Sequence, residues 1–307
     1  MASGVDKLSE LEVPEGVVLD HYSPAIGTEV KGIDLRRPLS DEVAGFLRRL
    51  WLKRKVIFFH GQELTPDQHI ALGRRFGELE QFPPDPRTSL QGYPELLIFR
   101  RGAGNTQREN VFHADLPFCD PPVAGTLVQL RECPEHGGDT IFVNMAAAYQ
   151  GLSEWLKRAI EGLKAEHRFD VITKYYNTAI SRERVDKLMA QFPPNTLPIV
   201  QTHPETGEKI LYVSIGYTSE IVGLPRDESF TLLKLLSDKA QVPEYQCRFR
   251  WRKNSIAMWD NRAIQHYACF DYGEQYRELH RVVVLDHRKW PQADDLTHSR
   301  RLVQRIN

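Results

Sequence analysis

Two histidines and one aspartate with the chemistry of metal ligands are the feature that most constrains this chain. His113 and Asp115 stand one residue apart, in Phe112-His113-Ala114-Asp115, whereas His266 lies far along the sequence. Two neutral imidazoles and one carboxylate leave half of a coordination sphere open, which suits a non-haem Fe(II) centre that binds O2. If the first pair lies on a strand, both side chains point to one face and can hold one ion.

Short apolar segments bounded by glycine, proline or charge recur along the chain and indicate a mainly β protein. The run Val56-Ile57-Phe58-Phe59 is typical of a buried strand. Other segments of this kind predict further strands at 17–34, 96–99, 125–132, 140–143, 209–215, 248–252, 255–259 and 279–285.

Helices are predicted outside these strands. Ser40 has the chemistry of an N-cap and opens an amphipathic helix, and Thr65-Pro66 starts a second helix that runs to Phe76. Two more are predicted at 153–164 and 229–240. The stretch 171–204 is polar and irregular, so we expect an inserted helix and loop segment at about 153–208. The chain shows no internal repeat, and we expect a single domain over 1–307.

Composition excludes several classes of protein. The chain is 41% hydrophobic and 26% charged, with 40 basic and 41 acidic residues and a net charge of -1. This balance gives no support to nucleic-acid binding. The four cysteines are scattered, which favours reduced thiols and a cytoplasmic location. We expect no signal peptide and no membrane span, because no apolar run is long enough.

Three segments together resemble a known family. They are Phe112 to Phe118, Gly137-Gly138-Asp139-Thr140, and Trp259 to His266 with its continuation to 277 and 281. The pattern resembles the taurine dioxygenase and 2,4-dichlorophenoxyacetate dioxygenase family of Fe(II)/2-oxoglutarate-dependent oxygenases, over about 17–284. The resemblance implies a double-stranded β-helix, a cupin-like jelly roll with helices packed outside. It also implies an enzyme that uses Fe(II), 2-oxoglutarate and O2.

The resemblance implies roles for six residues. His113, Asp115 and His266 would bind the iron, and Asp115 disfavours halogenation, because related halogenases have a small residue there. Arg277 matches the arginine that pairs with the distal carboxylate of 2-oxoglutarate, for which a guanidinium fork is well suited. Thr140 would add a hydrogen bond to that carboxylate. Trp259 would pack beside the co-substrate, and a structural core tryptophan is the alternative.

The substrate pocket is less defined. Arg281 matches the arginine that holds the sulfonate in the taurine enzyme, and a structural ion pair is the alternative. Phe118 and Tyr217 match aromatic pocket positions. Phe82 and Asp85 stand where the taurine enzyme has a histidine and a tyrosine, so taurine is not the expected substrate.

Other motifs have simpler interpretations. Gly137-Gly138 predicts a tight turn and not a phosphate loop, because no Lys-Ser/Thr pair follows. Lys174-Tyr175-Tyr176 could form a lid over the substrate, or a solvated loop. His280 should face away from Arg277 and Arg281 on a shared strand.

The resulting hypothesis is hydroxylation of a small anionic molecule, coupled to decarboxylation of 2-oxoglutarate to succinate and CO2. Desaturation, ring formation or another oxidation with the same cofactors is one alternative. A non-catalytic metal-binding jelly roll is another. By analogy with relatives, the chain could form a dimer or tetramer.

Overall fold

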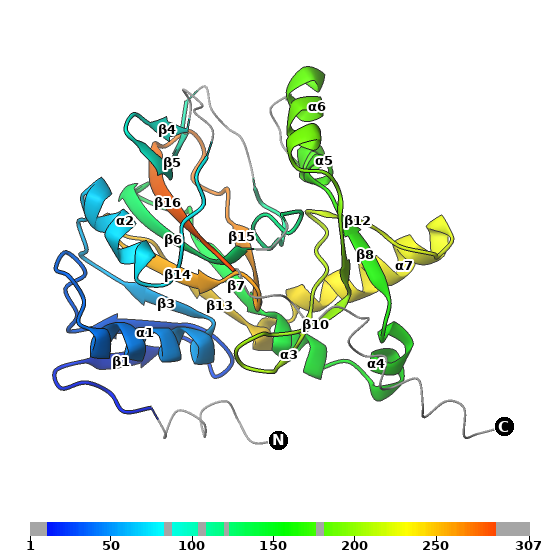
Figure 1. Ribbon diagram of the computed structural model, residues 1–307, viewed down its shortest axis with the longest axis horizontal. Helices are drawn as coiled ribbons and strands as arrows, with labels where there is room; N and C mark the ends of the chain where they lie inside the picture. Colours follow the sequence, from blue (N-terminus) through cyan, green and yellow to red (C-terminus); the bar gives the residue numbers. More distant parts are fainter. Residues whose placement is uncertain (1–10, 83–87, 104–108, 120–122, 176–180, 287–307) are drawn as a thin grey trace.

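A computed structural model describes residues 11–82, 88–103, 109–119, 123–175 and 181–286 of the chain. Its largest sheet has eight strands in the order β1-β2-β3-β14-β6-β16-β5-β4, all antiparallel to their neighbours except β2 beside β3 (Figure 1). The strands are β1 (Val18–His21), β2 (Thr28–Lys31), β3 (Val56–Phe59), β4 (Ser89–Leu90), β5 (Tyr93–Arg101), β6 (Val123–Glu132), β14 (Ile256–Asp260) and β16 (Arg277–Leu285).

A second, three-stranded sheet faces the first. Its order is β13-β7-β15, formed by β13 (Gln246–Phe249), β7 (Thr140–Asn144) and β15 (Ile264–Ala268). Aromatic side chains fill the space between the sheets: the rings of Phe58 and Phe249 stack at 4.1 Å, and Phe142 lies 5.6 Å from Phe58. The two facing antiparallel sheets form the jelly roll that the resemblance implied.

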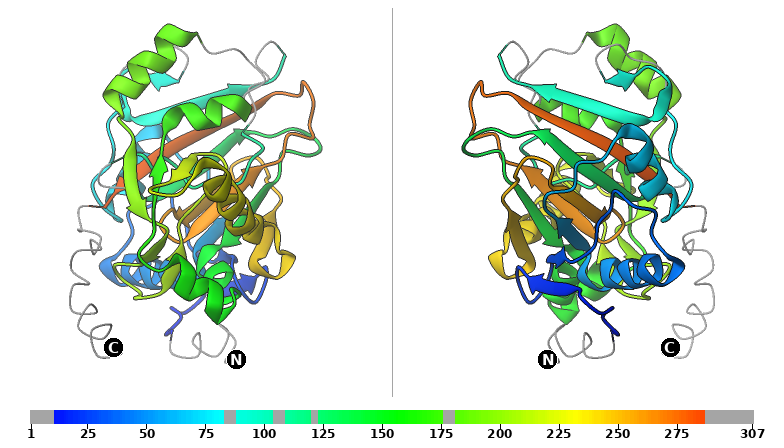
Figure 2. Two further views of the ribbon diagram at one scale, coloured as in Figure 1. Left: turned by 90° about the vertical axis from the view of Figure 1, so that its right-hand side faces the viewer. Right: turned by 90° about the vertical axis from the view of Figure 1, so that its left-hand side faces the viewer.

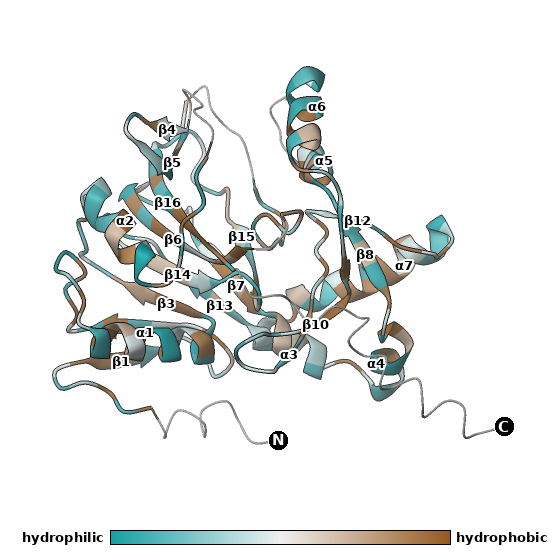
Figure 3. Ribbon diagram, viewed as in Figure 1, coloured by the Kyte–Doolittle hydropathy of each residue, from teal (hydrophilic) through white to brown (hydrophobic). Residues whose placement is uncertain are grey.

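The side chains of β3 pack into two different hydrophobic cores. Val56 and Phe58 pack between the two sheets, whereas Ile57 and Phe59 pack against the outer helices. Because side chains alternate along a strand, a strand covered on both faces must be apolar at every position. Figure 3 shows β3 as an apolar strand, in brown.

Two helices cover the outer face of the main sheet, and both begin where the sequence predicts. Helix α1 (Asp41–Arg54) has Ser40 as its N-cap. Helix α2 (Pro66–Arg74) starts with a capping box between Thr65 and Gln68, which pairs backbone N–H groups that the helix itself cannot pair.

The remaining elements lie on the opposite side of the molecule, as the two side views of Figure 2 show. They form a small sheet β12-β8-β9 and a hairpin β10-β11, packed with helices around Ile160, Leu211 and Leu236. The elements are α3 (Met145–Gln150), α4 (Glu154–Ile160), β8 (Lys164–His167), α5 (Phe169–Ile172), η2 (Thr173–Tyr175), α6 (Arg182–Gln191), β9 (Asn195–Pro198), β10 (Val200–Thr202), β11 (Lys209–Leu211), β12 (Thr218–Ile221), α7 (Arg226–Ser237), η3 (Asp238–Gln241) and η4 (Pro243–Tyr245).

Several predicted boundaries are wrong. The helix expected at 153–164 ends at Ile160, because Gly162 adopts a left-handed conformation (φ 78°) and β8 begins at Lys164. The strand expected at 209–215 stops at Leu211. The stretch 171–204, expected to be irregular, contains α6, β9 and β10. Within the described ranges, no helix is both long and apolar enough to cross a membrane.

Candidate metal centre and co-substrate cavity

The two histidines of the candidate triad are held together by their backbones. The amide of His113 donates to the carbonyl of His266 at 3.0 Å, and the amide of His266 donates back at 2.8 Å. His266 lies in β15, a strand that the sequence patterns did not predict, and the two imidazole centroids are 4.2 Å apart. This single β-bridge brings the two distant segments together.

Asp115 is not on a strand, contrary to the expectation from the His-x-Asp spacing. His113 forms only the isolated bridge, and Asp115 lies in a bend that continues into Leu116 with a left-handed φ of 48°. The side chain of Asn261 takes the place of a neighbouring strand. Its Oδ1 accepts from the Asp115 amide at 2.7 Å, and its Nδ2 donates to the Asp115 carbonyl at 2.6 Å.

The ligand atoms of His113, Asp115 and His266 all lie within 4.8 Å of one another, and all three residues are buried. Nδ1 of His113 lies 2.7 Å from the Val111 carbonyl, which assigns the proton to Nδ1 and leaves Nε2 with a free lone pair. Burial lowers the pKa of His266 to about 3, so its imidazole is neutral near pH 7.

Asp115 is ionised in the same setting. Burial opposes the charge, but the Arg281 guanidinium, followed by the neighbouring His266 and His113 and a hydrogen bond from Thr126, lowers the pKa of the carboxyl. Two imidazoles and one carboxylate form a donor set that fits a non-haem Fe(II) ion with positions left for other ligands.

A cavity of about 70 Å³, partly open to solvent, extends from His266 along the inner face of β16. Arginines and aromatic rings dominate its wall. The lining residues are Phe99, Arg101, Glu109, Val128, Thr140, Trp251, Trp259, His266, Ala268, Cys269, Phe270, Tyr272, Arg277, Leu279 and Arg281.

The far end of this cavity contains the predicted co-substrate residues. Arg277 is 6% exposed, and burial lowers the pKa of its guanidinium. No carboxylate forms an ion pair with Arg277 in the described part of the chain, and its Nε has no hydrogen-bond partner there. Thr140 accepts a hydrogen bond from Trp251 Nε1 at 2.9 Å, and the Arg277 guanidinium lies 5.9 Å from the Trp251 ring. A buried cation of this kind requires an anionic partner.

The segment predicted as a tight turn before Thr140 is a bend at 135–136 followed by irregular backbone at the two glycines. Gly137 and Gly138 are both left-handed, with φ of 75° and 72°. A Cβ on Gly137 would lie 2.5 Å from Asp271 Oδ1, so only glycine fits this close approach.

Trp259 lies at the boundary between the core and the cavity. Its ring lies 5.5 Å from Phe142 in the core and 5.0 Å from the imidazole of His266, and it also lines the cavity.

Arg281 forms the ion pair that was the alternative to substrate binding. Its Nη1 lies 3.2 Å from Asp115 Oδ1, and its guanidinium carbon lies 4.8 Å from the centre of the Phe99 ring. It also lines the cavity, so the pair leaves it accessible to a ligand. His280 points to the other face of β16 and binds Glu278 at 3.0 Å, as predicted.

The other predicted pocket residues lie outside the cavity wall. Phe118 and Tyr217 pack together at 5.5 Å in a small apolar cluster, and Tyr217 lies 5.8 Å from His113. Phe82 is half-buried near β5, where its amide donates to the Pro94 carbonyl. Asp85 and Tyr176 lie outside the described residues, and of the predicted lid only Lys174, which is exposed, can be placed.

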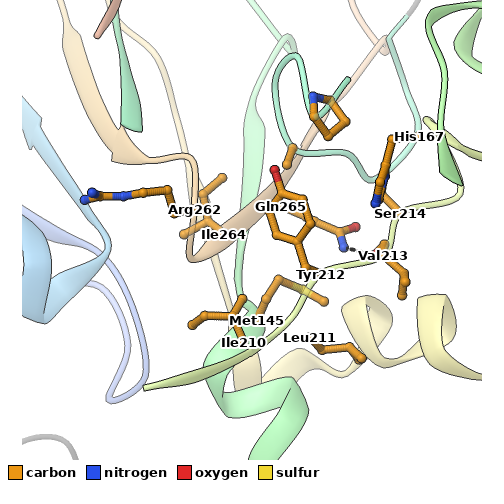
Figure 4. A pocket seen from close by; sticks show the side chains of 12 residues that line it. Met145, His167, Ile210, Leu211, Tyr212, Val213, Ser214, Arg262, Ile264 and Gln265 are labelled. Atoms are coloured by element: carbon orange, nitrogen blue, oxygen red, sulfur yellow. Dashed lines mark hydrogen bonds between the residues drawn. The ribbon is translucent and has the colours of Figure 1, made fainter. Parts of the chain in front are cut away.

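A second, smaller cavity lies behind the two metal-binding segments, against Ala114 and Gln265 (Figure 4). Its one charged lining residue, Arg262, extends its guanidinium away from the other side chains drawn in Figure 4 and is paired with Asp260 and Asp286. This cavity therefore offers no free charge to a charged co-substrate.

Sequence patterns missed several residues of the site. The sequence pattern assigns Trp251 only to an alternating strand, and Asn261 lies inside the segment Trp259 to His266 without an assigned role. Arg101 and Glu109 flank a polar segment that gave no signal of a site. All four are identified only by the contacts that the fold creates.

Comparison with known proteins agrees with this geometry. Residues 19–283 match the model of the taurine catabolism dioxygenase TauD, TfdA family. The chain belongs to this family, and it is accordingly a 2-oxoglutarate-dependent dioxygenase.

Individual relatives span most of the chain. It is 33% identical over 294 residues to the alpha-ketoglutarate-dependent 2,4-dichlorophenoxyacetate dioxygenase of Cupriavidus pinatubonensis, covering 88% of this chain and 98% of the relative. It is 31% identical to an alpha-ketoglutarate-dependent sulfate ester dioxygenase of Pseudomonas putida, covering 88% and 91%. The crystal structure of a taurine dioxygenase from Burkholderia xenovorans superposes with a TM-score of 0.77 at 32% identity, covering 90% and 92%.

Proposed function

We propose that this protein hydroxylates a small anionic molecule and couples this reaction to decarboxylation of 2-oxoglutarate to succinate and CO2. The observation that carries the proposal is the buried Arg277, which opens into the same cavity as the metal centre. A dicarboxylate that reaches from the metal to Arg277 would neutralise a buried cation that has no ion-pair partner among the described residues.

The proposed roles follow the geometry. His113, Asp115 and His266 would hold Fe(II), which when bound supplies the chemistry that activates O2. Arg277 and Thr140 would bind the distal carboxylate of 2-oxoglutarate, and Trp259 would pack beside it. These residues bind and orient the co-substrate, and the surrounding buried side chains keep water from the reacting atoms.

An anionic substrate is supported by Arg281 and by the relatives. Arg281 lines the cavity next to the metal ligand Asp115. Two relatives are named for a sulfate ester and an aryloxyacetate, both of which are anions. Phe118 and Tyr217 would shape the apolar side of the pocket near His113, and Phe82 would lie further from the reacting atoms.

Anaerobic addition of Fe(II) and 2-oxoglutarate to the metal-free protein tests the first half of the proposal. We expect a weak visible charge-transfer band, and Asp115→Ala should abolish both the band and turnover. Absence of the band in wild-type protein loaded with metal would refute the oxygenase assignment.

A succinate-release screen over carboxylates, sulfonates and sulfate esters tests the second half. The product mass separates hydroxylation, which adds one oxygen atom, from desaturation or ring formation, which removes two hydrogen atoms.

We further propose that the protein works in the cytoplasm as a homo-oligomer. Its four cysteines form no disulfide.

A further inference from the structure

A second arginine stands beside the co-substrate arginine. On the antiparallel pair β5 and β16, Arg101 is directly opposite Arg277, so both side chains project from the same face of the sheet. Arg101 lines the cavity, and only 11% of its side chain is exposed.

Arg101 and Arg281 both contact the same aromatic ring. The two guanidinium carbons lie 5.5 Å and 4.8 Å from the centre of one ring, that of Phe99. Arginine stacked on an aromatic ring keeps its in-plane N–H groups available for an anion. The Phe99 ring is therefore an apolar surface that is contacted by a guanidinium from β5 and by another from β16.

The resident partner of Arg101 is a weakly held carboxylate. Glu109 Oε1 lies 3.5 Å from Arg101 Nη2, at the limit of a hydrogen bond, and 31% of the Glu109 side chain is exposed. A long, partly solvated pair of this kind contributes little and can be exchanged for another anion.

The described charged side chains of the cavity favour an anionic substrate. Arg101, Arg277 and Arg281 line it, and the one described carboxylate in its wall is Glu109. A substrate acid group that replaces Glu109 at Arg101 would therefore meet a predominantly positive wall.

We propose that Arg101 is a specificity-determining residue that binds the acid group of the substrate together with Arg281, and that Glu109 occupies Arg101 until the substrate replaces it. This inference rests on the proposed function and narrows its substrate class to acids whose anionic group can contact two arginines. The acid group would lie over Phe99 between the two arginines. Glu109 then competes with the substrate, so its charge lowers the affinity for anions.

Binding experiments with two probes test this inference. 2,4-Dichlorophenoxyacetate and hexyl sulfate are titrated anaerobically into protein loaded with Fe(II) and 2-oxoglutarate, and KM is measured by succinate release. Arg101→Gln should weaken binding of the probe that wild type prefers by about 10-fold, because it removes one charge contact. Glu109→Gln should strengthen it by about 3-fold or more, because it removes the competitor.

Arg100→Gln is the matched control. Arg100 is the neighbouring arginine on β5, and it pairs with Glu278 at 3.0 Å. Its substitution should change neither probe affinity nor the 2-oxoglutarate requirement. Thermal unfolding confirms that each variant is folded, and Glu109→Gln tests the inference even if Arg101→Gln does not fold.

Three results overturn the inference. Unchanged probe affinity in Arg101→Gln is the first. The second is a loss of 2-oxoglutarate affinity in Arg101→Gln that exceeds the loss of probe affinity, because that result would assign Arg101 to the co-substrate. If wild type binds neither probe, the anionic substrate class fails at the level of the proposed function, and this inference fails with it.

Discussion

Asn261 binds the backbone of Asp115 from both sides, with its amide oxygen on the Asp115 N–H at 2.7 Å and its amide nitrogen on the Asp115 carbonyl at 2.6 Å. The pair imitates the two hydrogen bonds that a neighbouring strand would offer. Asn261 is itself fully buried in the turn between β14 and β15. The carboxylate of the candidate metal centre is therefore positioned by a side chain.

Replacing Asn261 with alanine should weaken Fe(II) binding by about 10-fold or more, because groups that orient metal ligands carry that much affinity. Titration of metal-free protein with Fe(II) under argon measures this loss. Asn195→Ala is the control, since Asn195 makes a comparable hydrogen bond to the Cys119 carbonyl at 3.0 Å. Equal iron affinities in the two variants would show that Asn261 has no positioning role.

Removing the guanidinium of Arg277 should act on the co-substrate and spare the metal. We expect Arg277→Gln to raise the dissociation constant of 2-oxoglutarate by about 30-fold or more, as the loss of a buried charge contact does. The charge-transfer band provides the titration signal. Arg248→Gln, which alters an exposed arginine paired with Asp139, should leave the constant unchanged. Lost iron affinity in Arg277→Gln would contradict the assignment.

A buried cluster of ion pairs around Arg262, next to the Asn261 turn, should contribute strongly to the free energy of unfolding. Arg262 is fully buried and binds both oxygens of Asp260 at 2.8 Å, as well as Asp286 at 2.8 Å. Arg262→Met would remove the guanidinium that pairs with these two buried carboxylates and with Glu205 at 2.9 Å, and it should cost about 3–5 kcal/mol in the free energy of unfolding. Urea denaturation measures it. Arg248→Met, at an exposed pair, should cost less than about 1 kcal/mol.

Buried His167 should make the protein less stable in acid. Burial lowers the pKa of His167 from 6.5 to about 3, so the unfolded chain binds a proton that the folded chain rejects. Its contribution is fully present above pH 6.5 and is lost as the pH falls toward 3, by about 1.4 kcal/mol per pH unit. His167→Gln should flatten the fall in unfolding free energy over this range. The same substitution at exposed His136 should leave the slope of wild type, and equal slopes in both variants would exclude the effect.

Local sequence patterns were sufficient to predict elements that are determined by their own residues. Ser40 and Thr65 cap their helices as predicted, and the apolar run of β3 is buried on both faces. The motif that contains His266 predicted a metal ligand that the fold brings beside His113 and Asp115, although β15 itself was not predicted. Its five residues are too few and too mixed in polarity to show a period.

Residues that work through distant partners could not be found in this way. Arg101 matters because β5 lies beside β16, and Asn261 matters because its turn reaches the bend at Asp115. Nothing near either residue in the sequence shows these partners. The expectation that Asp115 lies on a strand was wrong for the same reason, because the strand's role is taken by one distant side chain.

The β-bridge between His113 and His266 also has a consequence for synthesis of the chain. The ribosome makes His113 and Asp115 long before His266, and β16 with Arg277 follows later still. A nascent chain whose last strands are still in the ribosome has two of the three candidate ligands and no closed cavity. Iron loading should therefore be a post-translational event, and a truncated chain should not retain a metal ion that generates reactive oxygen.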